Sequence, residues 1–318
     1  MSIPRFRVLA TPYEQTMRDK QRRQWNKWLL IAAFVLPGLI LFTLFVLIPL
    51  PQSVYFSLYD WNGLGPPTDF RGFGNYERLL NHGVFQSSVL HSFVIMSLSV
   101  GVQLPLALGL ALLVGRGKLL GRRLFRIILF LPYVFSEIIT AIIWRYVLHP
   151  GDGLLNTLLE TFGFAPVALL GNRDTVLFGI FLVITWKYFG FHMILYMAGL
   201  QSIPSEVEDA ARVDGATEWK LLRYVTLPML GSTIRLSVFL SVLGSFQQFV
   251  ITWALTEGGP VNASELIATY LYKYGIQRFA LGYGSAVAVV LFTITLIFSL
   301  GISASSCVKI TTAIKGER

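Results

Sequence analysis

Long segments of this chain contain apolar residues and no charged ones. The segment WLLIAAFVLPGLILFTLFVLIPL, residues 28–50, has no Asp, Glu, Lys or Arg in 23 positions. A helix of about 20 such residues spans the roughly 30 Å hydrocarbon core of a bilayer. Charged residues make up only 14% of the whole chain, whereas a soluble domain is usually about a quarter charged. The pattern therefore predicts a membrane-spanning protein.

Six segments of this kind occur, and polar or turn-rich sequence flanks each of them. They are residues 28–50, 88–114, 124–147, 176–200, 232–255 and 283–305. The first is too long for the apolar core of a secretory signal peptide, and no A-x-A-like cleavage site follows it. We therefore expect an all-α integral membrane protein with six transmembrane helices, the first of which is retained.

The basic residues are unevenly distributed among the connecting segments. Nineteen Lys and Arg residues fall in one group of segments, namely 1–27, 116–126, 201–235 and 306–318. Only five fall in the other group, namely 51–87, 148–175 and 256–282. Because Lys and Arg are enriched in cytoplasmic loops, both termini are expected in the cytoplasm and the second group of loops outside.

The predicted organisation follows from this distribution. It consists of a cytoplasmic N-terminal segment (1–27), a transmembrane domain (28–306) and a cytoplasmic tail (307–318). The formal net charge of +9 then reflects membrane topology and attraction to anionic lipid. No nucleic-acid partner is expected, because the basic residues are segregated by loop and no nucleic-acid-binding signature is present.

One charged stretch, EVEDAARVDGATEWKLLRYVTLPM, interrupts the apolar pattern between the fourth and fifth spans. Val207, Ala210 and Ala211 fall at positions i, i+3 and i+4, so a helix here would have one small, apolar face. A solvated hairpin is the alternative interpretation. Small side chains let another backbone approach the helix closely, and a solvated hairpin has no need of such an approach.

Local signals predict a helix-turn-helix over this stretch. Ser205 followed by Glu208 fits a capping box at the start of a helix. The pair Asp214 and Gly215 supplies a turn, with the glycine able to adopt the left-handed conformation that ends a helix. Thr217 can then cap a second helix.

The segment IPSEVEDAARVDGATEWKLLRYVTLPML resembles the EAA signature of binding-protein-dependent ABC importer permeases. The similarity extends over roughly residues 28–305. The segments SLYDWNG, FRGFGNYERLL, IIWRYVLHPGDGLLNTLL and LTEGGPVNASELIATYLYKYG are similar to the sugar-permease branch, of the maltose and glycerol-phosphate transporter type. One position departs from the family pattern. Asp209 stands where Glu usually precedes the two alanines, which keeps the charge and shortens the side chain by one methylene.

The resemblance implies that residues 204–229 are a cytoplasmic coupling region that binds an ATPase subunit. The residues implied in this contact are Glu206, Asp209, Ala210, Ala211, Asp214 and Gly215. The implied partners are a second permease subunit, two copies of the ATPase and an extracytoplasmic solute-binding protein, in the inner (plasma) membrane of a bacterial cell.

ATP and Mg²⁺ would then belong to the ATPase subunit. This chain would hold no metal or other cofactor and catalyse no reaction. Its nearest P-loop look-alike, GRGKLLG at residues 115–121, lacks the spacing before Gly-Lys and the Ser or Thr that should follow the lysine.

Two other classes of membrane protein remain as alternatives. An intramembrane serine protease would pair Ser285 with His192 of another span. Gly284 and Ala288 form a small-xxx-small pair, so close helix packing also explains the residues around this serine. A secondary transporter would ordinarily show inverted repeats or a chain of acidic residues within its spans. Glu137 is the only clear intramembrane acid.

Polar residues within the spans are candidates for a substrate path, since such groups usually face the interior of a bundle. They are Glu137, Lys187, Tyr188, His192, Phe246, Gln247 and Gln248. Aromatic rings stack on sugars and amides bind their hydroxyl groups, so a sugar or polyol is the expected substrate. Lys187 also permits an anionic ligand, or it pairs with Glu137. Hydrogen bonding between helices, worth about 0.6 kcal/mol per bond, is the alternative use of the two amides.

The segment TEGGPVNASE, residues 256–265, is expected to be an exposed loop outside the cell. Glycine, proline and small polar residues dominate it, as is typical of turns and loops. We expect the binding protein to dock there, with contacts from Gly258, Gly259, Pro260 and Asn262.

Overall fold

Helices account for the regular structure of the chain. The computed structural model describes the backbone of residues 12–116 and 121–316, and the side chains of residues 23–115 and 121–302. These residues contain no β-strand, and an isolated β-bridge pairs Tyr59 with Phe70. The expected segments 1–27 and 307–318 lie partly outside the described residues. The chain divides into two units, Met1–Tyr55 and Phe56–Arg318, which are described separately.

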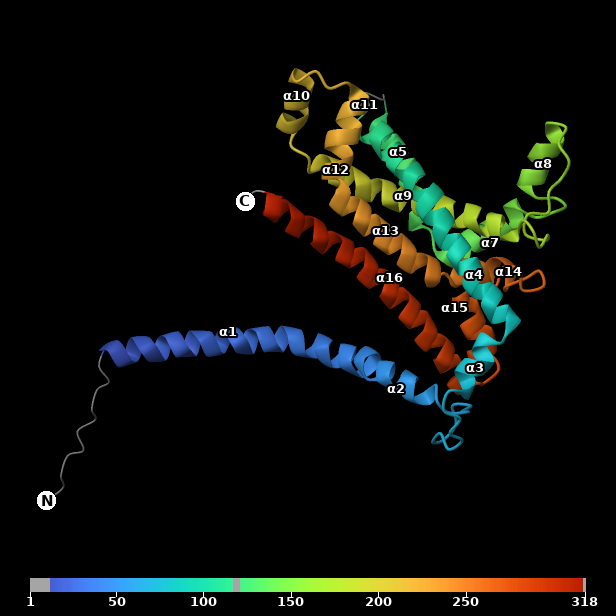
Figure 1. Cartoon of the computed structure of the whole chain (residues 1–318), viewed down its shortest axis with the longest axis horizontal. Helices are drawn as coiled ribbons and strands as arrows, with labels where there is room; N and C mark the ends of the chain where they lie inside the picture. Colours follow the sequence, from blue (N-terminus) through green and yellow to red (C-terminus); the bar gives the residue numbers. More distant parts are fainter. Residues whose placement is uncertain (1–11, 117–120, 317–318) are drawn as a thin grey trace. The chain divides into compact units, whose positions relative to one another are not determined.

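The first unit is a long apolar helix with a π-helical turn (blue in Figure 1). It comprises α1 (Pro12–Phe42), η1 (Thr43–Leu47) and most of α2 (Pro49–Phe56). Residues Arg23–Phe56 are long and apolar enough to cross a membrane, in agreement with the predicted span 28–50. Leu29, Phe34 and Phe45 are each more than half exposed, which suits a helix surrounded by lipid.

The second unit is a helical bundle. Its first helices are α3 (Gly74–Leu80), α4 (Gly83–Leu98), η2 (Ser99–Gln103), α5 (Leu104–Arg116), α6 (Arg122–Val134), α7 (Glu137–Val147), α8 (Leu154–Thr161) and α9 (Val176–Gln201). The others are α10 (Ser205–Val213), α11 (Glu218–Leu221), η3 (Leu222–Thr226), α12 (Leu227–Met229), α13 (Gly231–Phe246), α14 (Val250–Thr256), α15 (Ile267–Tyr270), η4 (Leu271–Ile276) and α16 (Leu281–Gly316). Four helices in the described chain are long and apolar enough to cross a membrane, and two bent pairs raise that number to as many as six.

Helix α9 lies at the centre of this bundle. It packs against α5, α6, α13 and α14, and half of its 26 residues are buried. Two glycines allow the close approach. A Cβ atom at Gly190 would overlap the backbone of Leu129 in α6, and one at Gly199 would overlap Thr233 in α13. Small residues have this role in many membrane helix contacts.

The third predicted span, residues 124–147, is broken. Helices α6 and α7 meet at an angle of 99°, and Phe135 and Ser136 between them are extended. The break follows Pro132, which lies within α6 and has no N–H to donate to the preceding turn.

The fifth predicted span, residues 232–255, is not one helix. Helix α13 ends at Phe246, and the chain resumes a helical course only at Val250 in α14. At its other end α13 is bent by 66° from the α11–α12 segment. Hydropathy reports composition and not backbone direction, so the sequence pattern missed the interruption.

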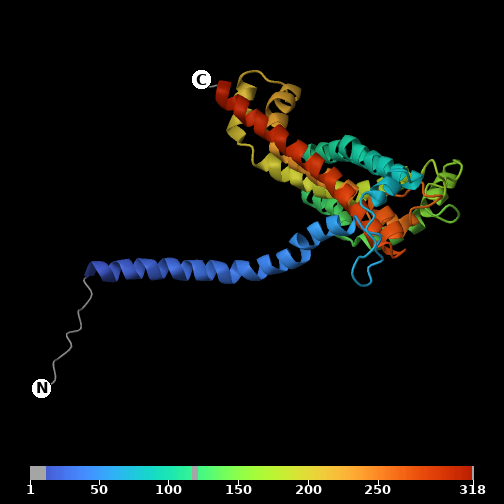
Figure 2. The same ribbon diagram turned by 60° about the horizontal axis from the view of Figure 1, so that its bottom comes forward.

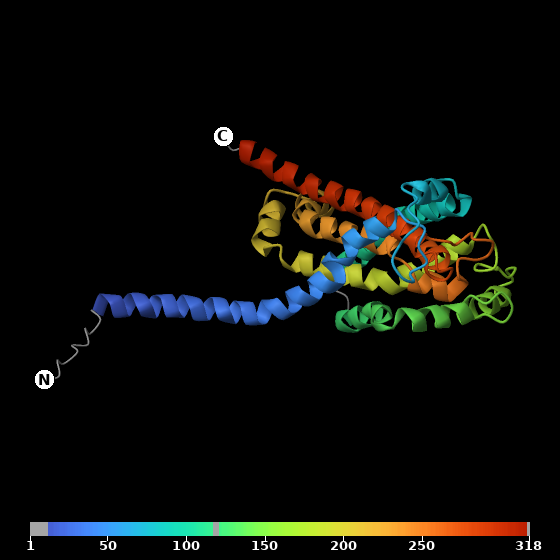
Figure 3. The ribbon, with the colours of Figure 1, turned by 90° about the horizontal axis from the view of Figure 1, so that it is seen from below.

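The loops of the second unit segregate to two ends of the bundle, with α16 running along its length (Figure 2). Figure 3 places α10 and α11 at one end, near the start of α6. Helices α3, α8 and α15 lie at the opposite end. Within this unit, the described segments rich in Lys and Arg therefore share one end, and the segments poor in them share the other.

We expect Gly190→Ala to destabilise the protein. The added methyl group would push against the α6 backbone, and overpacking of this kind costs about 1–3 kcal/mol. Gly109→Ala in α5 is the matched control, because an added Cβ there meets no atom within 4 Å. Thermal unfolding of the detergent-solubilised complex should show a lower midpoint for Gly190→Ala and an unchanged or higher midpoint for Gly109→Ala. Equal midpoints would contradict the close contact.

Candidate functional site

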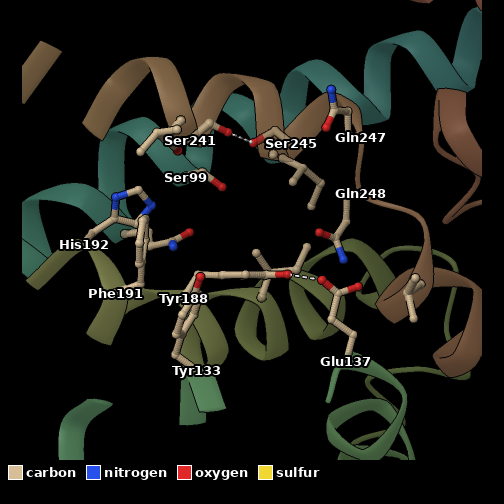
Figure 4. Close-up of a pocket in the computed structure, with 16 residues that line it drawn as sticks. Ser99, Tyr133, Glu137, Tyr188, Phe191, His192, Ser241, Ser245, Gln247 and Gln248 are labelled. Atoms are coloured by element: carbon tan, nitrogen blue, oxygen red, sulfur yellow. Dashed lines mark hydrogen bonds between the residues drawn. The ribbon is translucent and has the colours of Figure 1, made fainter. Parts of the chain in front are cut away.

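A polar cavity of about 320 Å³ lies within the bundle (Figure 4). The α4–η2 segment, α6, α7, α9 and α13 contribute its walls. Its polar lining residues are Ser99, Gln103, Tyr133, Glu137, Tyr188, His192, Ser241, Ser245, Gln247 and Gln248. Both helix breaks open onto it, since Glu137 begins α7 and Gln248 follows α13. Non-helical backbone at membrane depth is tolerated where it lines such a cavity.

The carboxylate of Glu137 lies at the mouth of the first break. The hydroxyl group of Tyr188 donates a hydrogen bond to its Oε1 atom (Figure 4). Glu137 is also the first residue of α7, where the positive end of the helix dipole stabilises a negative charge. The cavity therefore contains a fixed anionic group.

His192 faces the cavity from α9 and is paired with another span. Its Nδ1 atom lies 2.7 Å from the Oγ atom of Ser237, which is fully buried. The predicted alternative pairing with Ser285 is not formed among the described contacts. The pair links α9 to α13 and offers no exposed nucleophile.

Two buried polar atoms at the cavity have no partner in the described chain. They are Nε2 of Gln248 and Oγ of Ser241. Their residues are 7% and 6% exposed. Because buried polar groups are nearly always hydrogen-bonded, each of these atoms has unused hydrogen-bonding capacity.

Lys187 does not line the cavity. Its Nζ atom donates hydrogen bonds to the carbonyl oxygens of Phe135, at 2.5 Å, and Tyr133, at 3.3 Å. No ion pair joins it to Glu137 within 4 Å among the described residues. The sequence suggested that Lys187 either binds an anionic ligand or forms an ion pair with Glu137. The structure instead assigns the ammonium group to the backbone at the α6–α7 break.

The remaining predicted residues divide between the cavity and the packed core. Phe246 is fully buried and packs against Phe93 and Phe298, with ring centroids 5.2 and 5.7 Å away. Phe246 therefore faces away from the cavity.

Sequence reasoning missed Ser241 and Ser245, which line the cavity from α13. Their i, i+4 spacing within an apolar helix is the signal that could have found them.

The helix-turn-helix after α9 forms where the sequence predicts it. Gly215 has a φ of +80°, the left-handed conformation expected of a glycine after a helix end. Thr217 caps α11 by accepting a hydrogen bond from the Lys220 N–H at 3.5 Å. The predicted capping box is absent, because Pro204 is the N-cap residue and Ser205 already lies inside α10.

Arg212 connects the two short helices. Its guanidinium group lies 3.2 Å from Asp209 in α10 and 3.4 Å from Glu218 in α11. All three side chains are well exposed, and ion pairs between solvent-exposed groups contribute little to stability. The contact orients the helices more than it stabilises them.

Apolar side chains are exposed along this helix-turn-helix. Val213, Trp219 and Tyr224 are 87%, 67% and 69% exposed, and α10 has no buried residue. We call these three side chains, together with α10, the coupling surface. Glu206, Ala210, Asp214 and Gly215 are exposed on it, and Ala211 is half-buried.

The segment 256–265 is less exposed than the sequence predicts. Gly258 is buried, while Gly259, Pro260 and Asn262 are half-buried. The tip of the loop is Val261, which is 80% exposed.

An ion pair with one buried partner holds this loop in place. Glu265 is fully buried, and its carboxylate pairs with Lys273 at 3.1 Å. Lys273 also donates a hydrogen bond to Asn262 at 3.1 Å. The close packing of Gly258 against Glu265, where a Cβ would overlap the carboxylate, keeps the neighbouring backbone in the body of the protein.

The bundle of membrane-length helices around a polar cavity defines a transmembrane transport protein. Residues 103–306 match the family described as the binding-protein-dependent transport system inner membrane component. The chain belongs to this family, and it is a permease subunit of an ABC transporter. It carries out no ATP hydrolysis, which belongs to a separate subunit of such transporters.

Three comparisons illustrate the relationship. The probable ABC transporter permease YurN of Bacillus subtilis is 34% identical over 271 residues, which cover 84% of this chain and 92% of YurN. The lactose transport permease LacF of Rhizobium radiobacter is 32% identical, covering 81% and 86% of the two chains. A bacterial alginate ABC transporter, solved with an alginate-bound periplasmic protein, superimposes with a TM-score of 0.77 and 24% identity, over 91% of this chain and 96% of that one.

We expect Lys187→Met to reduce assembly and transport together. The carbonyl groups of Tyr133 and Phe135 would lose their donor, and lipid cannot replace it. Glu137→Gln should not restore assembly, because the two residues are not paired. Lys27→Met, at an exposed position in α1, is the control for loss of one lysine. The yield of purified complex and the uptake into vesicles are measured in parallel for each variant. Normal assembly with abolished uptake in Lys187→Met would contradict the structural role of Lys187.

Proposed function

We propose that this chain forms half of the translocation path of an ATP-driven importer for a carbohydrate or related polyol. The observation that carries the proposal is the continuity of α9. Its middle provides Tyr188 and His192 to the cavity, and the coupling surface begins only three residues after its end. A movement of the coupling surface therefore reaches the cavity through one rigid helix.

The coupling surface fits an ATPase subunit as its partner. Exposed Val213 and Trp219 supply apolar contact area, and interfaces are enriched in aromatic residues. The small side chains of Ala210 and Ala211 let a partner approach α10 closely. The acidic and basic residues around them specify the partner through charge complementarity. ATP and Mg²⁺ would bind to that partner.

The opposite end of the bundle fits an extracytoplasmic binding protein. Val261 projects there from a loop that the ion pair between Glu265 and Lys273 immobilises. A fixed loop binds with a smaller entropy loss than a mobile one. A bacterial alginate ABC transporter of the same fold was solved in complex with a periplasmic protein. That complex supports the same kind of assembly for this chain. The family description also includes dependence on a binding protein.

The proposed topology has six spans with both termini in the cytoplasm. Helices α6 and α7 together count as one span, α13 belongs to the fifth span, and the end that holds the coupling surface is the cytoplasmic one. A second permease subunit completes the path in the bacterial inner membrane. The carbohydrate class is supported by the lactose transport permease among the relatives and by the mixture of aromatic rings and hydroxyl and amide groups that lines the cavity.

The topology can be checked with a matched pair of cysteine variants. We expect Val261→Cys to react with an impermeant maleimide added outside intact cells, and Val213→Cys to react only after permeabilisation. Both side chains are at least 80% exposed in this chain. The variants are labelled in cells that lack the ATPase subunit, so that no partner covers Val213. Cys307, the single native cysteine, is replaced by Ser in both variants. Labelling in the reverse order would overturn the proposed orientation.

We expect Gly215→Val to uncouple ATP hydrolysis from transport. An L-residue at positive φ is strained by about 1–2 kcal/mol, so the valine should change the angle between α10 and α11. Ala211→Leu should instead weaken assembly by adding bulk to the face of α10 that binds the ATPase. ATPase stimulation by the loaded binding protein and vesicle uptake are measured on one preparation.

Gly163→Val provides the control for Gly215→Val. Gly163 also has a φ of +80° and open space around its Cα, but it follows α8 at the opposite end of the bundle. It should leave the ratio of uptake to ATP hydrolysis unchanged. Normal stimulation and uptake in both Gly215→Val and Ala211→Leu would contradict the coupling role.

A further inference from the structure

We propose that the cavity selects an uncharged, hydroxyl-rich ligand and rejects anionic sugars, with Glu137 and Gln248 as the residues that determine this specificity. The inference rests on the proposed function, since it concerns the substrate class of the same path. The sequence left both a neutral and an anionic ligand possible, and this inference favours the neutral one.

The charge of the cavity is the first observation. Among its described lining residues, Glu137 is the only Asp, Glu, Lys or Arg. The cation nearest in sequence to the lining residues of α9, Lys187, donates instead to the carbonyl groups of Tyr133 and Phe135. No Lys or Arg side chain is therefore present among the described lining residues to balance a carboxylate, phosphate or sulfonate group. Such a group would meet Glu137 in a region of low dielectric constant, where like charges repel strongly.

The hydrogen-bonding capacity of the cavity is the second observation. Glu137 receives one hydrogen bond, from Tyr188, and a carboxylate can accept about four. The buried Nε2 group of Gln248 has no acceptor, and Figure 4 shows the Gln248 amide directed toward the Glu137 carboxylate. An acceptor and a donor thus face the same space.

Neighbouring hydroxyl groups of a sugar match this pair. One hydroxyl can donate to the Glu137 carboxylate while the next accepts from the Gln248 amide. Ser241 offers a further unpartnered hydroxyl group. Tyr133 and Phe191, stacked with centroids 4.9 Å apart, supply aromatic surface for the apolar C–H groups of a sugar ring.

The test uses a cysteine reporter in the complete transporter reconstituted in proteoliposomes. Ser245→Cys places a thiol on the cavity wall, in a transporter otherwise depleted of cysteine, and its alkylation by N-ethylmaleimide is timed. The probes are cellobiose, maltose and lactose, each compared with its uronic-acid analogue at the same concentration and ionic strength. A ligand that occupies the cavity slows alkylation.

We expect at least one neutral disaccharide to slow alkylation about fivefold or more, and its uronic acid to require about tenfold higher concentration for the same effect. Glu137→Gln should reduce that difference to about twofold, because the repelling charge is removed while the side chain keeps its size. Glu160→Gln, which neutralises an exposed acid on α8, should leave the difference intact. Gln248→Met should abolish protection by the neutral sugar, which provides a second test if Glu137→Gln fails to assemble.

The outcomes separate this inference from the proposed function. Equal protection by the neutral and acidic sugars, or stronger protection by the acid, would overturn the selectivity and leave carbohydrate transport standing. Unchanged discrimination in Glu137→Gln would remove the role of Glu137. If no sugar of either kind protects the thiol in a transporter whose ATPase responds to its binding protein, the carbohydrate class itself is wrong and the selectivity falls with it.

Discussion

The hydrogen bonds from Lys187 to the carbonyl oxygens of Tyr133 and Phe135 are the contacts on which the interior of this protein depends. A helix that breaks at membrane depth leaves carbonyl groups that lipid cannot satisfy. Lys187 supplies the missing donors from α9, so α6 and α7 can diverge by 99°. The break in turn places Glu137 at the start of a new helix and exposes it to the cavity. Without this cation the broken span would expose uncompensated backbone.

Helix α9 joins the cavity to the coupling surface. It carries Lys187 beside the break, Tyr188 and His192 at the cavity, and then leads through a three-residue connection into α10. Its glycines allow α6 and α13 to lie against it closely enough that a shift of one helix must displace the others, because packed helix surfaces interdigitate. The ion pairs of Arg212 similarly relate α10 to α11. The coupling surface and the cavity therefore belong to one connected set of contacts.

Local sequence rules predicted the class of the protein and much of the helix-turn-helix that follows α9. Charge-free segments indicated membrane helices, and the EAA-like stretch indicated an ABC permease, which the family match confirms. The left-handed Gly215 and the cap by Thr217 also follow from the sequence, since each depends on the conformation of a few consecutive residues. The positions of Tyr188, His192 and Gln248 at one cavity follow in part from the tendency of intramembrane polar groups to face the bundle interior.

Only the tertiary structure decided where the spans break and which side chains meet. Lys187 reaches a carbonyl 52 residues earlier in the chain, a contact that no local pattern contains. Phe246 and Gln248 lie two positions apart, yet the first packs into an aromatic core and the second lines the cavity, because α13 ends between them. Ser99 joins the same cavity from a different span. Hydropathy along the chain determines that a segment enters the membrane, but the rotation and packing of neighbouring helices determine which of its residues face one another.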